Sequence, residues 1–131
     1  MTEVTQVPEW FARWEQAMHG EISVGQRFVA ESDPTFMEAF VGFSGPMFAR
    51  PDNLITAEVR EIVIISIQAS LGQWEPVRGH IKRALVDGVP PKMILEGLEL
   101  AAMAAGVGKL FGGAEILAEE LEAAGRTFAD D

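Results

Sequence analysis

One carboxylate and one imidazole in this chain stand where they could share a proton. Glu61 lies in a segment rich in aliphatic residues. Its neighbours on the same helical face are Ala57, Ile64 and Ile65, and carboxylates are rarely buried without a partner. If His80 is that partner, burial raises the pKa of the carboxyl, the carboxylate supports an imidazolium, and the pair can pass a proton near neutral pH. The pair therefore predicts acid–base chemistry, with a structural Glu–His hydrogen bond as the alternative.

Two helices joined by a tight turn would bring these side chains to the same level. With a rise of 1.5 Å per residue, Glu61 lies about 16 Å before a turn at Gly72, and His80 lies about 12 Å after it. An antiparallel hairpin over this segment would therefore allow the carboxylate and the imidazole to meet.

An anionic substrate would also need a cation near the pair. Arg83 follows His80 by about one helical turn and shares its side, so we take it as the better candidate. Arg60 is adjacent to Glu61, with an interface salt bridge as its alternative role. Trp74, at the start of the His80 helix, could wall the pocket or pack in the core. The other histidine, His19, stands beside Gly20 at a helix end, where we interpret it as a capping residue.

Glycine and proline divide the chain into about six helix-sized segments. The expected helices cover residues 8–18, a segment from Asp33 that is one long helix or two short ones, and residues 56–71, 76–86, 91–105 and 110–124. Residues 62–67 have a strand-like composition, but the length between Thr56 as N-cap and Gly72 as C′ residue favours a helix. We expect this helix to be buried around most of its circumference. We predict an all-α fold with a central antiparallel helix hairpin.

Charge and cysteine content exclude several classes of function. The chain has 10 Lys and Arg against 20 Asp and Glu, a net charge of −10, which argues against nucleic acid and anionic membrane surfaces. Because it has no cysteine, it cannot form disulfides, thiolate zinc sites or a cysteine nucleophile. Two histidines are too few for a His-rich metal site, and we expect no metal. The polar, acidic start is not a signal peptide and no apolar run is long enough to cross a bilayer, so we expect a cytoplasmic protein.

The hydrophobic content is high for such a short chain. Of its 131 residues 48% are hydrophobic and 23% are charged, and the mean hydropathy is +0.14. One domain is the expectation for this length, and a small domain has too little interior for so much apolar material. We therefore expect a homo-oligomer that buries part of it between subunits.

Three stretches of sequence resemble the carboxymuconolactone decarboxylase family, within the alkylhydroperoxidase-D-like superfamily. Residues 54–64 (LITAEVREIVI) and 78–89 (RGHIKRALVDGV) carry the resemblance, and residues 94–106 fit the next family helix. The likeness covers about residues 54–118 and is looser over 33–50, so that residues 1–30 look like a variable helical extension of a single domain over 1–131. The family's usual trimers and hexamers agree with the expected oligomer.

The resemblance implies a reaction as well as a fold. Superfamily peroxidases place a Glu, two Cys and a His in one relay, and here those positions hold Glu61, Gln73, Pro76 and His80. A peroxidase is thereby excluded, and the cysteine-less decarboxylase branch remains. By that resemblance we expect a cofactor-free lyase in which His80 protonates a small unsaturated lactone acid as CO₂ leaves, Glu61 tunes His80, and Arg83, Arg60 and Trp74 bind the substrate. The alternatives are an isomerase, cyclase or hydrolase using the same pair, and a non-enzymatic helical oligomer that binds a small ligand.

Overall fold

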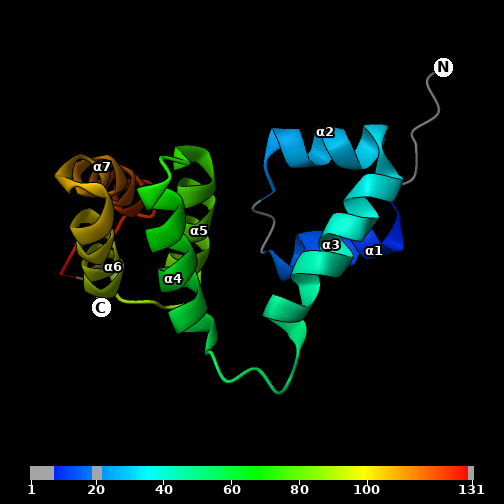
Figure 1. Ribbon diagram of the computed structural model, residues 1–131, viewed down its shortest axis with the longest axis horizontal. Coiled ribbons are helices and arrows are strands. Elements are labelled where there is room, and N and C mark those ends of the chain that lie inside the picture. Colours follow the sequence, from blue (N-terminus) through cyan, green and yellow to red (C-terminus); the bar gives the residue numbers. More distant parts are fainter. Residues whose placement is uncertain (1–7, 19–21, 130–131) are drawn as a thin grey trace. The chain divides into compact units, whose positions relative to one another are not determined.

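All regular structure is helical in the computed structural model, which describes residues 8–18 and 22–129 (Figure 1). The helices are α1 (Glu9–Ala17), α2 (Val24–Ser32), α3 (Pro34–Ala49), α4 (Ala57–Ser70), α5 (Trp74–Val86), α6 (Pro91–Ala105) and α7 (Val107–Ala123). The predicted all-α fold is confirmed, with seven helices over the described ranges where about six were expected. The capping role predicted for His19 falls outside these ranges.

The chain divides into two compact units, Met1–Leu54 and Ile55–Asp131. Helices α1 to α3 belong to the first unit and α4 to α7 to the second (Figure 1). All five predicted site residues follow residue 54, so the second unit holds the candidate site. A single domain over the whole chain, with residues 1–30 as an extension, stays a prediction.

The first unit has a small aromatic core around α1. Phe11 and Trp14 are buried there with their ring centroids 5.8 Å apart, and a salt bridge of 2.7 Å joins Glu15 to Arg27 on α2. The other buried members of this core are Met18, Ala30 and Met37.

Helix α2 is the element that the sequence analysis missed. Its signal is local, because Ser23 and Gln26 form a capping box in which each side chain accepts a hydrogen bond from the other residue's backbone N–H. Helix α3 settles the choice between one long helix and two short ones. It begins at the predicted cap, where Asp33 accepts from the N–H of Phe36, and it continues through Pro46 without a break.

In the second unit, α4 and α5 form the predicted antiparallel hairpin. The hydroxyl of Thr56 caps α4 by accepting from the N–H of Val59 over 3.2 Å, as expected. At the other end Gly72 has φ of +71°, which other residues rarely adopt, and the N–H of Gln73 donates to the carbonyl of Gln68. Helix α5 begins at Trp74 rather than Pro76, because proline is tolerated within a first helical turn.

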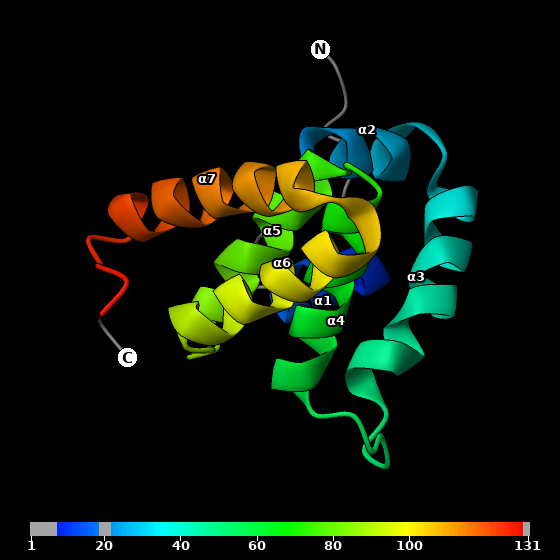
Figure 2. The ribbon, with the colours of Figure 1, turned by 60° about the vertical axis from the view of Figure 1, so that its left-hand side comes forward.

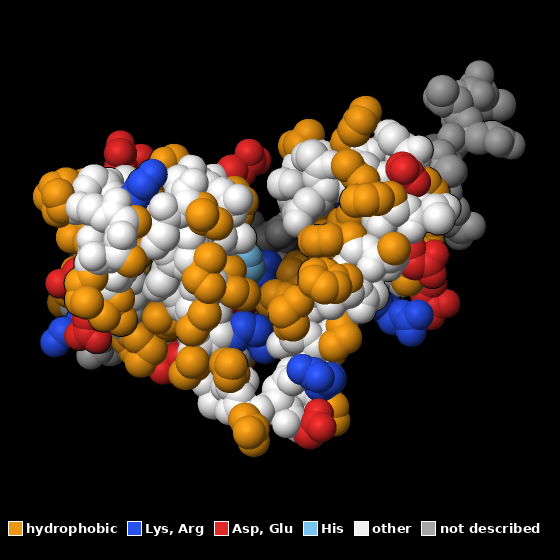
Figure 3. All heavy atoms as spheres, viewed as in Figure 1, with side chains coloured by type: hydrophobic (Ala, Val, Ile, Leu, Met, Phe, Trp, Pro, Cys, Tyr) orange, Lys and Arg blue, Asp and Glu red, His pale blue; other side chains and the backbone are white. Residues whose placement is uncertain are grey.

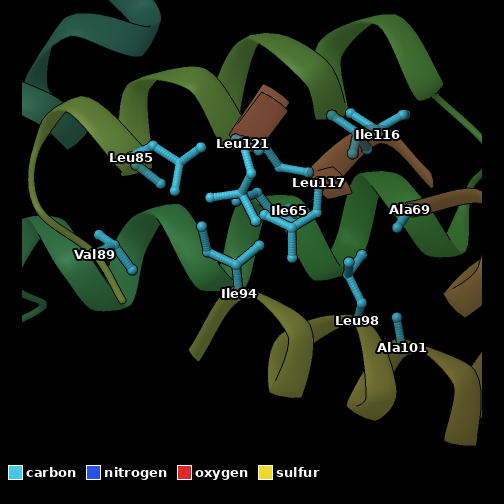
Figure 4. Close-up of a cluster of buried hydrophobic side chains, with 13 residues drawn as sticks. Ile65, Ala69, Leu85, Val89, Ile94, Leu98, Ala101, Ile116, Leu117 and Leu121 are labelled. Carbon is cyan, nitrogen blue, oxygen red and sulfur yellow. The ribbon is translucent and has the colours of Figure 1, made fainter. Parts of the chain in front are cut away.

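Helices α4 to α7 pack around one aliphatic core. Ile65 of α4, Ile81 of α5, Leu98 of α6 and Leu117 of α7 are all buried in it, so each helix contributes to the same interior. Figure 4 shows Ile65, Ile94, Leu98 and Leu117 directed toward one another. This shared core holds the hairpin in place and thereby sets the spacing of the side chains that α4 and α5 carry.

Glycines in α6 and α7 let these helices pack closely against α4 and α5. A Cβ at Gly97 would lie 2.9 Å from Cγ2 of Ile62, and one at Gly112 would lie 2.7 Å from the Trp74 ring. Helix α7 begins at Val107 rather than at the expected residue 110, and Gly108, Gly112 and Gly113 all lie inside it. Gly112 and Gly113 are therefore contact points between helices.

Helix α4 is not buried around most of its circumference, as we had expected. Val59, Val63 and Ile67 are all exposed on the side away from the core, because this unit has only three other helices to cover α4. Other exposed apolar side chains include Phe36 and Phe43 of α3, and Figure 3 shows apolar groups at the surface of both units.

Over the residues that the structure describes, every helix lacks either the length or the apolar composition that a transmembrane span requires.

Candidate active site

The predicted meeting of Glu61 and His80 takes place across the α4–α5 hairpin. Nδ1 of His80 lies 2.8 Å from Oε2 of Glu61. The Glu61 side chain is fully buried, and the His80 side chain is 15% exposed. The register argued from Gly72 therefore placed these two residues correctly, and the imidazole is the member of the pair that solvent can reach.

Arg83 joins the pair from the next turn of α5. Its Nη1 donates to the second carboxylate oxygen, Oε1 of Glu61, over 3.3 Å, and the arginine is itself buried. Each oxygen of Glu61 thus faces one basic side chain. We expected Arg83 on the His80 side of the helix, where it is found, but its contact with the carboxylate was not foreseen.

These cations reverse the pKa shift that we expected for Glu61. Burial by itself raises the pKa of the carboxyl, as the sequence analysis argued. The hydrogen bond from His80 and the positive charges of His80, Arg83 and Arg60 outweigh it, so the pKa of Glu61 lies below its ordinary value. Glu61 is therefore a carboxylate at neutral pH, and it cannot be the member of the pair that delivers a proton there.

An ionised Glu61 decides which nitrogen of His80 carries hydrogen. A carboxylate only accepts hydrogen bonds, so Nδ1 must be protonated to donate to Oε2. Nη1 of Arg83 is also 3.3 Å from Nδ1, but both nitrogens are then donors, and the carboxylate is the acceptor that they share. Nε2 has no hydrogen-bond partner within the described part of the chain and is left for an external group.

The remaining arginines of α4 and α5 differ in their surroundings. Arg60 is partly buried next to Glu61 and contributes to lowering the pKa of that carboxyl. Arg78 is turned toward α7, where it donates to Glu120 over 2.7 Å and also pairs with Glu119. The Glu120 hydrogen bond is the main reason that the pKa of Arg78 is raised. Arg60 and Arg83 thus lie by the candidate site, and Arg78 ties two helices together.

Trp74 is not brought into the Glu61–His80–Arg83 group by any contact among the described residues. Its ring packs beside Gly112 of α7, and Nζ of Lys109 lies 5.8 Å from the ring centroid. Trp74 is partly buried against the aliphatic core, and its role as a wall of the substrate pocket stays a prediction.

Gln68 is a polar residue that the sequence analysis did not single out. It lies two turns beyond Glu61 on the same face of α4, and its Oε1 is buried without a hydrogen-bond partner in the part of the chain that is described. The seven-residue spacing from Glu61 is the signal that could have indicated it.

No group of three or more His, Asp or Glu residues capable of holding a metal ion occurs among residues 8–18 and 22–129. The polar atoms gathered around Glu61 are instead those of a carboxylate, an imidazole and a guanidinium. Such a set can accept, hold and return a proton, and it can attract an anion.

The family to which these features belong is identified by comparison with known proteins. The model of the carboxymuconolactone decarboxylase family matches residues 34–119, more than half of the chain. The protein belongs to this family. The matched region contains Glu61, His80 and Arg83, and it begins after the predicted extension. No significant match is found to a curated protein or to a solved structure.

Proposed function

We propose that this protein is a cofactor-free lyase of the carboxymuconolactone decarboxylase type, acting on a small unsaturated lactone acid. The observation that carries the proposal is the 2.8 Å contact between Nδ1 of His80 and the buried carboxylate of Glu61. It holds the imidazole through Nδ1 and leaves Nε2 for the substrate. Membership of the family is compatible with decarboxylation by such a pair.

The proposed reaction is one C–C cleavage and one proton transfer. The substrate's carboxylate leaves as CO₂, and the electron pair of the broken bond is taken up by the conjugated lactone carbonyl. The Nε2 proton of the His80 imidazolium then goes to carbon, and the ring regains a proton from water. Glu61 stays ionised throughout. Its role is to accept the hydrogen bond from Nδ1 and hold the ring in place.

The substrate is anionic, so it needs positive charge at the site. Arg60 and Arg83 are the proposed cations, because both act on the carboxylate of Glu61 and so lie in its vicinity. Arg83 is the more deeply buried of the two and also pairs with Glu61. Trp74 stays a proposed apolar wall of the substrate site at the start of α5.

A thiol mechanism is not available to these residues. The chain has no cysteine, and the resemblance described above assigns Gln73 and Pro76 to the positions of the cysteines of the superfamily's peroxidases. Neither side chain can be oxidised and reduced as a cysteine pair can. The proposed chemistry is therefore proton transfer.

The test is to incubate the purified full chain with carboxymuconolactones and related unsaturated lactone acids and to measure CO₂ release. In D₂O one deuterium should appear on carbon in the product. His80→Asn keeps a polar side chain of similar size but cannot act as an acid, and it should lower kcat by at least about 100-fold. His19→Asn makes the same change at the other histidine and should leave kcat unchanged.

The outcomes separate the proposed lyase from its alternatives. Turnover of these acids without CO₂ release would replace the lyase by an isomerase, cyclase or hydrolase using the same pair. Binding without turnover, combined with unfolding of the His80→Asn variant, would assign Glu61 and His80 a structural role in a ligand-binding protein.

A further inference from the structure

One amide oxygen of the second unit is buried without a hydrogen-bond partner. Oε1 of Gln68 on α4 is covered by protein and meets no donor within residues 8–18 and 22–129, although the residue as a whole is partly exposed. Buried polar atoms are nearly always hydrogen-bonded, because an unsatisfied one costs free energy that an apolar side chain of the same shape does not. A donor that these residues do not supply would remove this cost.

The register of the hairpin places Gln68 near the candidate site. Helices α4 and α5 lie side by side (Figure 2), and the N–H of Gln73 fixes the end of α4 by donating to the carbonyl of Gln68 over 2.9 Å. With a rise of 1.5 Å per residue, Gln68 lies about 6 Å before Gly72 and His80 lies about 12 Å after it, so that their levels differ by about 6 Å. Gln68 is therefore displaced from His80 toward the turn by little more than one helical turn.

The face of α4 that carries Glu61 changes in character toward the turn. Glu61, Ile64 and Gln68 follow one another at steps of three and four residues, so they share this face. It starts with the carboxylate that holds His80, continues with an aliphatic side chain and ends with a neutral amide. Residues 62–74 contain no charged side chain. A ligand lying along this face would meet charged groups at one end and a neutral polar group at the other.

Neighbouring residues of α5 and α7 leave the amide oxygen without a donor. Pro76 is level with Gln68 across the hairpin, and proline has no backbone N–H. Nζ of Lys109 comes close to the turn, since a Cβ at Gly72 would lie 3.1 Å from it, but this nitrogen stands over the Trp74 ring at 5.8 Å from the centroid. The terminal torsion of glutamine has a broad energy well, so the amide can turn its oxygen toward a ligand at little cost.

We propose that Gln68 determines substrate specificity by accepting a hydrogen bond from a neutral hydroxyl or N–H group of the ligand. The inference rests on the proposed function for the other end of the ligand, where the carboxylate of a lactone acid lies beside His80. A small lactone ring with one substituent can bridge the levels of His80 and Gln68. The ligand class narrows to lactone acids that carry a hydrogen-bond donor on the side of the ring away from the carboxylate.

The first test needs no ligand and measures thermal unfolding of the full chain by circular dichroism. Gln68→Met keeps the length of the side chain and removes the unsatisfied oxygen. Its midpoint should be at least as high as that of the wild type, with a rise of up to about 5 °C. Gln16→Met makes the same change at an exposed position of α1 and should leave the midpoint unchanged. A midpoint of Gln68→Met below that of the wild type would show a structural role for the amide and overturn the inference.

The second test measures binding by isothermal titration calorimetry with two saturated lactone acids, which lack the conjugated system that the proposed reaction needs. One acid carries a hydroxymethyl group on the ring, remote from the carboxylate, and the other carries an ethyl group at the same carbon. The wild type should bind the hydroxymethyl acid about 5- to 10-fold more tightly, and Gln68→Met should bind the two acids with affinities within about 2-fold of each other. Gln16→Met should keep the preference of the wild type.

CO₂ release from the corresponding unsaturated acids separates this inference from the proposed function. A wild type that prefers the hydroxymethyl acid and releases no CO₂ would keep Gln68 as a specificity residue and remove the lyase. CO₂ release by a wild type that binds the two saturated acids equally would keep the lyase and overturn the inference. A preference that survives in Gln68→Met would overturn it too, and so would a wild type that binds neither acid.

Discussion

Nδ1 of His80 on α5 lies 2.8 Å from Oε2 of Glu61 on α4, and the carboxylate is fully buried while the imidazole is partly open. This relationship gives the two members of the pair separate tasks. Glu61 receives positive charge from three basic side chains and stays ionised. His80 keeps its second nitrogen for a group from outside. The proposed acid–base role of the pair depends on an ionised Glu61 and on an accessible second nitrogen of His80.

The stability that Glu61 contributes should depend on pH in a definite direction. Its pKa is lowered in the folded protein, so the contribution is complete above the unfolded value of about 4.3 and is lost as the pH falls through the folded value. Glu61→Gln should lower the free energy of unfolding by about 2 kcal/mol at neutral pH. Urea denaturation followed by circular dichroism should show the difference from wild type shrinking in acid. A difference that grows in acid would contradict the assignment.

The two arginines near Glu61 should respond differently to removal of their charge. Arg83 is buried against the carboxylate, so Arg83→Met should lower both kcat and the denaturation midpoint. Arg60→Met should raise KM several-fold and lower kcat less than Arg83→Met does, because Arg60 contributes least among the three basic side chains that lower the pKa of Glu61. Steady-state kinetics with the accepted lactone acid would check this split. Equal effects on KM from both variants, with no loss of stability, would show that neither arginine supports Glu61.

A methyl group should be tolerated at one glycine of α7 and not at another. A Cβ at Gly113 would overlap the side chain of Leu98, so Gly113→Ala should destabilise the protein by about 1–3 kcal/mol. Gly108 has nothing within 4 Å of the same position, and Gly108→Ala should stabilise α7 by up to about 1 kcal/mol. The two thermal midpoints should therefore move in opposite directions from the wild type. Similar shifts would show that α6 and α7 do not pack through Gly113.

The link between α5 and α7 through Arg78 should be weak and sensitive to salt. Arg78→Met removes the ion pairs with Glu119 and Glu120. Because the arginine is 38% exposed, the loss should be at most about 1 kcal/mol. The destabilisation, measured by urea denaturation, should shrink as salt is added, since screening weakens these pairs in the wild type. A loss that is unchanged in high salt would indicate that the arginine stem contributes through packing instead.

Local signals in the amino-acid sequence were sufficient for several helix ends and for the register of the hairpin. Asp33 and Thr56 cap helices, and Gly72 ends one, because each effect needs only the few residues around it. The same locality explains why Glu61 and His80 could be paired in advance, since a tight turn sets the level of both. The start of helix α2 could also have been predicted from the sequence, because Ser23 and Gln26 form its capping box.

Other features depended on neighbours that are distant in the sequence. The contact between Gly112 and the ring of Trp74 joins residues 38 positions apart, and it places Trp74 beside α7. The aliphatic composition of helix α4 suggested burial around most of its circumference, and the number of helices available to cover it decided otherwise.

Residue types and local spacing established an all-α chain with no thiol chemistry and with a carboxylate facing an imidazole across one turn. They could not establish the ionisation of that carboxylate. Burial opposes hydrogen bonding and charge in setting its pKa, and the balance depended on how closely His80, and after it Arg83, approach the two oxygens of Glu61. Those distances follow from the packing of α4 and α5 on a core shared with α6 and α7. Composition and periodicity contain no measure of them.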